Sequence, residues 1–234
     1  MFGSLITAAS DRDTKVTIYR SEAVPGADAG LERHGIPIEY ADLPPAGPEP
    51  FVVIEADGEF TGALALSAFD VLTDTPIVRP GLGEGVSRPY RVLFEALDDT
   101  FFEALTRRQL LAVSREIEDR AYRVGTGQLR VGFQSLSVFR SQVDVYRHLA
   151  TETDLDIHIY GSDDWDPPEI PGVRYHVPAD EEFERYWFLA FDGGETGSHA
   201  CGLVAREEID EYDGFWTDDQ EVVGEILAVL TKEE

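Results

Sequence analysis

The chain has 234 residues and a formal net charge of −27, with 46 acidic residues against 19 basic ones. Only Lys15 and Lys232 are lysines. A surface this acidic repels phosphate backbones and anionic lipids, which argues against direct nucleic-acid binding and against membrane insertion. The hydrophobic content of 43% argues equally against acidic intrinsic disorder. The composition predicts a cytoplasmic protein of the haloarchaeal type, because molar salt shortens the Debye length to about 3 Å and relieves the repulsion.

Cysteine content and hydropathy exclude further structural features. A single cysteine, Cys201, excludes an internal disulfide and a cysteine-cluster metal site. No run approaches 18 apolar residues, so we expect no membrane span. The first residues lack a basic region before an apolar run, so no signal peptide is predicted. The length suits one large domain or two small ones.

Residues 1–88 are predicted to form a smaller N-terminal α/β segment. Runs rich in β-branched and aromatic residues indicate strands, at 15–19, 36–40, 51–55 and 60–66. Asp57-Gly58 separates the last two runs and favours a tight hairpin turn. A short helix is expected at 68–72, followed by a connector rich in glycine and proline at 76–89.

Residues 89–125 are predicted to be connecting or signalling helices. Apolar residues recur at four-residue spacing, at Leu93, Leu97, Phe101 and Leu105, and the pattern resumes after Arg108 as far as Val124. One interpretation is that this stripe packs entirely against its own sheet. The other is that Leu97, Phe101 and Leu105 form an interface with a partner protein or a second copy of the chain.

Residues 126–234 are predicted to be the folded core. Strands are expected at 129–133, 156–160, 173–177, 185–191 and 199–206, with helices at about 137–150 and 218–231. Residues 186–191 are apolar on both faces, where a half-exposed strand would alternate. This run is therefore predicted to be central in a sheet covered on both sides.

Several short runs together resemble the DICT sensory domain, a family associated with diguanylate cyclases and two-component systems. They are Ile117-Glu118-Asp119-Arg120-Ala121-Tyr122, Val131-Gly132-Phe133-Gln134, Tyr146, Ile159-Tyr160-Gly161 and Gly214-Phe215-Trp216-Thr217. The matches are densest between about 105 and 232. The resemblance implies a fold of the α/β (α+β) class, with a GAF-like antiparallel sheet flanked by helices. It also implies ligand or partner binding without catalysis.

Catalytic and metal-binding patterns are weak. His199 and Cys201 have the i, i+2 spacing of one strand face, but no third group that would orient a base is evident. His158 and His176 lie in consecutive predicted strands and could approach each other, although a metal would need further ligands. The acidic run 163–166 is interpreted as a solvated loop.

Charged residues alternate along the predicted helix around 107–123. The basic members are Arg107, Arg108, Arg115, Arg120 and Arg123, and the acidic members are Glu116, Glu118 and Asp119. Such a pattern is typical of an ion-paired helix surface. The Gly81-x-Gly-x-Gly run lacks a preceding strand and is interpreted as a linker.

Taken together, the sequence predicts a non-catalytic sensory protein that binds a small ligand or a partner protein and needs no cofactor or metal. Tyr146, His158, Trp187 and Cys201 are the candidate pocket residues, because they supply aromatic walls and a few polar groups. A constitutive interaction or scaffold protein, in a process such as motility or cell morphology, is the alternative. An enzyme that uses His199 and Cys201 is the third possibility.

Overall fold

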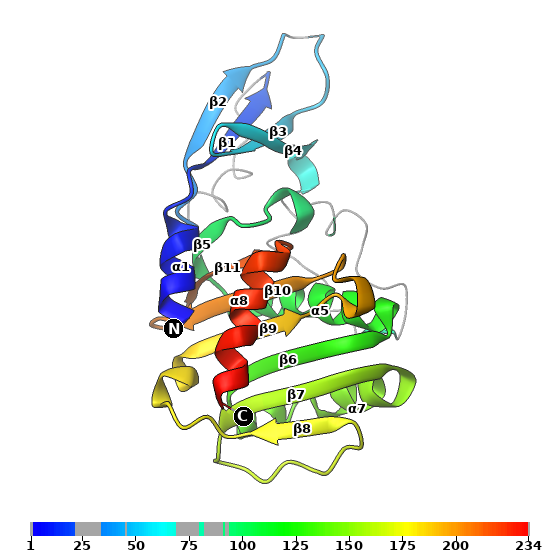
Figure 1. Ribbon diagram of the computed structural model, residues 1–234. Coiled ribbons are helices and arrows are strands. Elements are labelled where there is room, and N and C mark those ends of the chain that lie inside the picture. The colour runs from blue at the N-terminus through cyan, green and yellow to red at the C-terminus, as the bar shows by residue number, and fades with distance from the viewer. Residues whose placement is uncertain are drawn as a thin grey trace.

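The computed structural model describes residues 2–21, 34–44, 46–68, 80–81, 91 and 94–233. Within them the chain forms two sheets, a four-stranded one of order β2-β1-β3-β4 and a seven-stranded one of order β5-β11-β10-β9-β6-β7-β8. Helices α1 and α8 lie on one face of the larger sheet and α5 on the other (Figure 1). The predicted mixed α/β class with a smaller N-terminal segment is confirmed.

The smaller sheet consists of strands β1 (Thr14–Arg20), β2 (Ile38–Asp42), β3 (Phe51–Ala56) and β4 (Glu59–Ala65). Asp57 and Gly58 take φ angles of 52° and 80°, so the predicted hairpin turn joins β3 to β4 through left-handed residues. A single 3-10 turn, η1 (Leu66–Ala68), follows β4. The rest of the predicted helix at 68–72 and most of the connector at 76–89 lie outside the described residues.

The larger sheet contains β5 (Phe101–Leu105), β6 (Thr126–Ser135), β7 (Asp154–Ser162), β8 (Val173–His176), β9 (Tyr186–Phe191), β10 (Cys201–Glu207) and β11 (Tyr212–Thr217). All six residues of β9 are buried and β9 is the fourth of seven strands, which confirms its predicted central place. Strands β6, β7 and β8 run parallel, so the prediction of an antiparallel sheet is wrong there. A parallel pair needs a crossover, and the helices between β6 and β7 supply it.

The described helices are α1 (Phe2–Ser10), α5 (Arg107–Val124), α6 (Leu136–Phe139), α7 (Val143–Glu152) and α8 (Gln220–Leu230), with 3-10 turns η2 (Glu181–Arg185), η3 (Gly194–Thr196) and η4 (Thr231–Glu233). Helix α5 is the longest, with 18 residues. Thr106 and Gln109 form a capping box at its start, and Gly125 ends it in the left-handed conformation with φ of 75°.

The prediction of continuous helices from about 90 to 124 is wrong at residues 101–105, which form the edge strand β5. This strand is short and irregular, because its pairing with β11 shifts register and Ala104 has a φ of 52°. The distortion hides the alternation typical of a strand and leaves a spacing that mimics a helix. Leu97 and Leu105 are buried in the core of the chain at 0% and 3% exposure, and Phe101 is half-buried.

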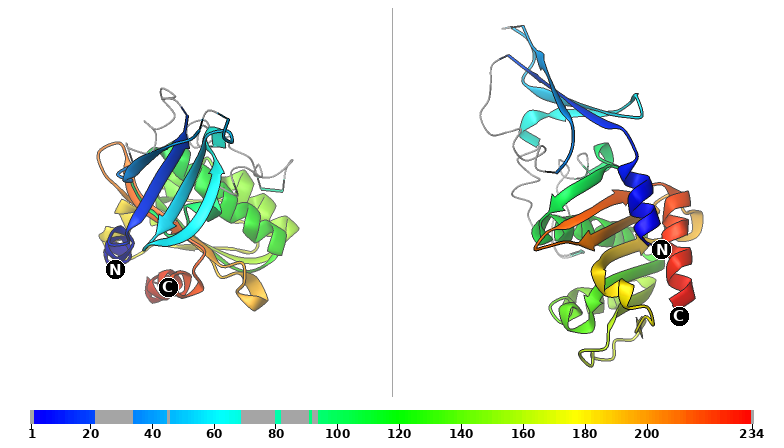
Figure 2. Two further views of the ribbon diagram at one scale, coloured as in Figure 1. Left: turned by 90° about the horizontal axis from the view of Figure 1, so that it is seen from above. Right: turned by 90° about the vertical axis from the view of Figure 1, so that its left-hand side faces the viewer.

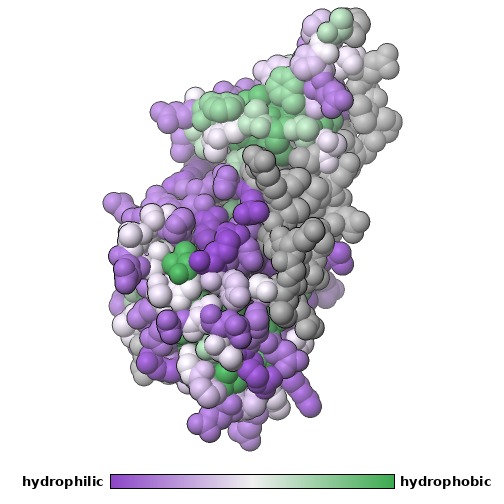
Figure 3. Space-filling view, turned by 90° about the vertical axis from the view of Figure 1, so that its right-hand side faces the viewer, coloured by the Kyte–Doolittle hydropathy of each residue, from purple (hydrophilic) through white to green (hydrophobic). Residues whose placement is uncertain are grey.

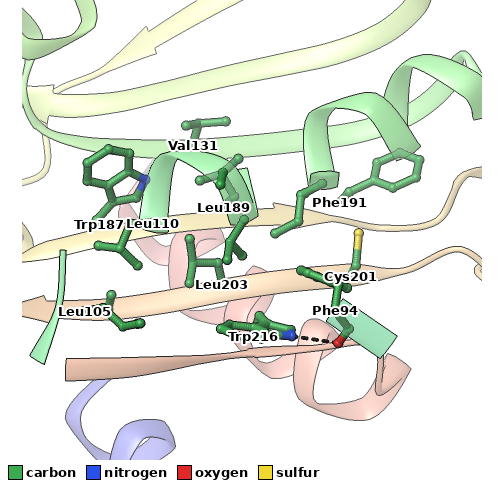
Figure 4. Packing of buried hydrophobic residues seen from close by; sticks show 14 of the residues in the cluster. Phe94, Leu105, Leu110, Val131, Trp187, Leu189, Phe191, Cys201, Leu203 and Trp216 are labelled. Carbon is green, nitrogen blue, oxygen red and sulfur yellow. Dashed lines mark hydrogen bonds between the residues drawn. The ribbon is translucent and has the colours of Figure 1, made fainter. Parts of the chain in front are cut away.

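The two faces of the larger sheet bury different sets of side chains, because alternate residues of β9 point in opposite directions. Trp187 and Leu189 pack with Leu203 of β10 on the α5 face (Figure 4). Tyr186 and Phe188 pack on the other face, against α1 and α8. Because both faces of β9 are buried, this strand is apolar throughout.

Helix α1 belongs in sequence to the N-terminal segment but packs with α8 on the larger sheet (Figure 2). Phe2 and Ile6 are buried there together with Ile226 and Leu230 of α8. After α1, the chain continues into the smaller sheet. Arg12, just past α1, forms a 2.5 Å ion pair with Asp99, which lies shortly before β5.

Candidate ligand site beside helix α5

Helix α5 buries charged residues as well as its apolar stripe. Its apolar side, with Leu110, Ile117 and Ala121, faces the sheet. Arg115, Glu116, Glu118 and Asp119 are nevertheless at most 6% exposed. The predicted ion pairing is present, but the prediction of a helix surface is wrong for these four residues. A buried charge requires a partner, and the partners divide into two groups on the helix.

The first group joins α5 to α7. The guanidinium of Arg115 donates to Glu118 and to Gln142, and the Tyr146 hydroxyl donates to Glu118 Oε1 at 2.6 Å. Complete burial raises the pKa of Tyr146 well above its ordinary value, and the nearby Glu118 adds to the shift. The phenol therefore remains a hydrogen-bond donor at neutral pH.

The second group surrounds an open cavity of about 580 Å³ between α5 and the segment that leads into α8. The described residues that line it are Arg91, Glu95, Glu116, Arg120, Arg123, Val124, Ser198, His199 and Asp218. Its volume lies in the range of small-molecule pockets. Three arginines face three carboxylates there, a balance that contrasts with the 46 acidic and 19 basic residues of the chain.

Glu116 has an incompletely hydrogen-bonded side chain in the wall of this cavity. It is 1% exposed, and its Oε2 atom has no hydrogen-bond partner among the described residues. Its Oε1 atom lies 4.0 Å from Arg120 Nη2 and 3.6 Å from Arg123 Nη2, both beyond hydrogen-bond distance. Burial raises the pKa of Glu116 to about 7, although the arginines act in the opposite direction.

The two arginines are held in place by other carboxylates. Arg120 Nη1 donates to Asp218 Oδ1 at 2.7 Å, and Arg123 Nη1 donates to Asp119. Asp98 then accepts a 2.7 Å bond from the Asp218 backbone N–H. Burial, together with the charges of Asp99 and Asp218, raises the pKa of Asp98 to about 7. Two carboxyl groups in this region therefore titrate near neutral pH.

The four predicted pocket residues do not come together. Tyr146, Trp187 and Cys201 belong to the core on the α5 face, whereas His158 projects from β7 to the opposite face. Trp187 Nε1 donates to Ser114 Oγ at 3.1 Å, so the polar groups of Trp187 and Tyr146 are both bonded within the protein. The physical reason for their separation is strand alternation, since His158 follows the core residue Ile157.

His158 and His176 do meet, as their strands suggested. His158 Nδ1 lies 2.9 Å from His176 Nε2, and the rings are stacked with an interplanar angle of 2°. Arg174 Nη1 lies 3.1 Å from His158 Nε2, and Asp156 Oδ2 lies 3.3 Å from the same His158 nitrogen. Within the described part of the chain, no three histidine, cysteine, aspartate or glutamate side chains are grouped so that they could hold a metal ion.

His199 and Cys201 differ in their surroundings. His199 is exposed at the cavity and precedes β10, while Cys201 is fully buried as the first residue of that strand. Burial raises the pKa of the Cys201 thiol to about 12, which opposes formation of a nucleophilic thiolate. The cavity could not be predicted while the alternating charges of Glu116, Arg120 and Arg123 indicated an ion-paired helix surface. Their i, i+4 and i+7 spacing was the available signal.

None of the described helices is long and apolar enough to cross a lipid bilayer. No curated protein sequence matches the chain. The crystal structure of a polyphosphate kinase from Porphyromonas gingivalis aligns over 97% of this chain at 13% sequence identity, with a TM-score of 0.41. The chain spans 47% of the length of that protein.

A family model for the DICT domain, described as a sensory domain in diguanylate cyclases and two-component systems, matches residues 92–208. The match covers half of the chain. It includes β5, α5 and the strands β6 to β10, and therefore most of the larger sheet. Seven of the described cavity-lining residues fall within it, namely Glu95, Glu116, Arg120, Arg123, Val124, Ser198 and His199. The chain belongs to the DICT sensory domain family.

Proposed function

We propose that this protein is a non-catalytic sensor that binds a small polar ligand in the cavity beside α5 and passes the bound state to a partner protein by direct association. One observation carries the proposal: buried Glu116 lines an open cavity, and its Oε2 atom has no hydrogen-bond partner among the described residues. A buried polar atom without a partner costs about 1–3 kcal/mol. A ligand that meets this atom recovers that cost on binding.

Helix α5 offers a physical route by which the ligand could act on the rest of the molecule. Glu116, Arg120 and Arg123 line the cavity, while Arg115 and Glu118 of the same helix bind α7. A small rotation of α5 that improves contacts to a ligand would therefore alter its contacts with α7. A ligand shifts such an equilibrium only by its difference in affinity for the two arrangements.

The proposed signalling surface is not the one expected from Leu97, Phe101 and Leu105, because Leu97 and Leu105 are buried. The smaller sheet offers apolar surface instead. Phe60 is 67% exposed and Tyr40 is 45% exposed. Figure 3 shows apolar residues gathered over this sheet, in contrast to the mostly hydrophilic lower part of the molecule. A signalling partner or a second copy of the chain could bind there.

The same surface favours a second candidate function, that of a constitutive interaction or scaffold protein in a process such as motility or cell morphology. In this case association would not depend on the cavity. An enzyme that uses His199 and Cys201 is less well supported, since the raised pKa of the Cys201 thiol keeps it protonated at neutral pH.

The test is to purify the protein from its native source in high salt and to identify bound small molecules by native mass spectrometry and bound proteins by proteomics. The double variant Arg120→Lys/Arg123→Lys should lose the small molecule and change the amount of partner recovered. The matched control is Arg147→Lys, because Arg147 pairs with Asp144 on the exposed side of α7. A small molecule that both variants retain would place ligand binding elsewhere, and partner recovery that is equal in all samples would favour the scaffold function.

A further inference from the structure

The chemical class of the ligand follows from the polar atoms that line the cavity, if the cavity is the ligand site proposed above. The Nε atom of Arg91 is buried without a hydrogen-bond partner among the described residues, as is Glu116 Oε2. An arginine Nε–H can only donate. Because Arg91 lines the cavity, its guanidinium offers a ligand hydrogen-bond donors and no acceptor.

The remaining donors of the cavity point to the same class. Arg120 and Arg123 use their Nη1 atoms on Asp218 and Asp119. Their Nη2 atoms lie 4.0 and 3.6 Å from Glu116 Oε1, too far for hydrogen bonds. Planar guanidinium groups are suited to carboxylates and phosphates.

Glu116 would oppose such a ligand if it were ionised, because two negative charges would meet in a buried site. A protonated Glu116 removes the repulsion and offers an O–H donor in the same direction. The pKa of about 7 places the protonated form within reach at neutral pH. The Oε2 atom, which is buried and has no hydrogen-bond partner among the described residues, would then carry the proton that Glu116 donates to the ligand.

We propose that the cavity binds a small molecule through an oxyanion group, carboxylate or phosphate-like, with Arg91, Arg120 and Arg123 as donors and Glu116 in its protonated form as a further donor. Binding is then coupled to proton uptake by Glu116. The charged or titratable groups around Glu116 are Asp119, Arg120 and Arg123 on α5, Arg91, Cys201 of β10, Asp218 before α8, and His199 and Glu95 on the cavity wall.

The experiment is calorimetric titration of the intact chain with sulfate and with acetate at a constant 0.5 M KCl. Both probes keep their charge between pH 6 and pH 8, and together they distinguish tetrahedral from planar oxyanions. The wild-type dissociation constant should rise about tenfold from pH 6 to pH 8, because the protonated fraction of a group with a pKa of about 7 falls by that factor. Buffers of different ionisation enthalpy should report uptake of about one proton at pH 8.

Three variants make the assignment specific. Glu116→Gln keeps a neutral donor at this position, so it should bind the probe equally well at both pH values. Arg123→Gln should weaken binding at least tenfold, whereas Arg147→Gln on the exposed side of α7 should not change it.

Proton release on binding, or weaker binding by Glu116→Gln than by wild type at pH 8, would overturn the proposal in favour of a ligand that donates to an ionised Glu116. If neither probe binds but a small molecule from the native source is lost from the Arg120→Lys/Arg123→Lys variant, the oxyanion class is wrong and the sensory function remains supported. If no molecule binds in either experiment, both proposals fail.

Discussion

The Tyr146 hydroxyl and Glu118 Oε1 are 2.6 Å apart, and their hydrogen bond joins α7 to α5 inside the protein. Tyr146→Phe would remove this donor and leave a buried carboxylate whose remaining partner among the described residues is Arg115. We expect a loss of about 1–3 kcal/mol in the free energy of unfolding, measured by urea denaturation. Tyr175→Phe is the control, because its hydroxyl bonds to the Pro168 carbonyl in a half-buried position. Equal losses in both variants would contradict a special role for the Tyr146 bond.

The stability of the protein should depend on pH through Glu116. Its pKa in the folded chain is about 7, above the ordinary value of 4.5, so the folded state favours the protonated form. The stabilisation from this proton is complete below pH 4.5 and is lost as pH rises to about 7. Glu116→Gln has no such loss, so its melting temperature should rise relative to wild type over that interval. A constant difference from pH 4.5 to pH 8 would show that Glu116 titrates normally.

Asp98 also contributes to the pH dependence of stability, because burial raises its pKa to about 7 as well. Asp98 shifts the stability of wild type and Glu116→Gln alike, so it cancels in the difference. Asp144→Asn, on the exposed surface of α7, is a suitable control for the removal of one carboxylate. It should show no such change with pH.

The central strand should not tolerate a charge. Leu189 is 1% exposed in β9 and packs on the α5 face of the sheet. Leu189→Asp would bury an unpaired carboxylate, and we expect a loss of about 4 kcal/mol or more, seen as insoluble or unfolded protein. Val177→Asp introduces the same group at a position that is 53% exposed and should leave the circular dichroism spectrum unchanged. A soluble, folded Leu189→Asp protein would contradict this account of the core.

Salt should stabilise the fold. The net charge of −27 produces repulsion among surface carboxylates, and added salt screens it. The melting temperature should rise steeply between about 0.1 and 2 M KCl. Scanning calorimetry in KCl provides the measurement, and the same scan with sucrose in place of salt separates screening from a general solute effect. An unchanged melting temperature in KCl would mean that the acidic composition has another cause.

Cys201 should be chemically inert in the folded protein. Burial raises the pKa of its thiol to about 12, and the side chain is fully enclosed. We expect no reaction with iodoacetamide at pH 8 until denaturant is added, followed by mass spectrometry of the intact chain. Cys201→Ala should keep ligand and partner binding within a few-fold. Rapid labelling of the native protein would instead restore the enzyme hypothesis.

Local chemistry explains which features could be predicted from the sequence. The Asp57-Gly58 turn was predictable because this dipeptide favours tight hairpin turns. The strand at 186–191 was predictable because a strand buried on both faces is apolar at every position. The strand at 101–105 was not, since the left-handed Ala104 interrupts its alternation. The cavity depends on Asp218, which lies 98 residues from its partner Arg120. No local pattern reports a contact over that separation.

The contact of α1 with α8 has a consequence for the order in which the molecule folds. Phe2 and Ile6 share their buried cluster with Ile226 and Leu230, from the opposite end of the chain. Edge strand β5 similarly has its partner in β11, about a hundred residues later. During synthesis these early segments have no native surface to bind until the last elements emerge. Because closing such distant contacts is slow, the apolar side of α1 stays uncovered until α8 has been synthesised and is a natural site for chaperone binding until then.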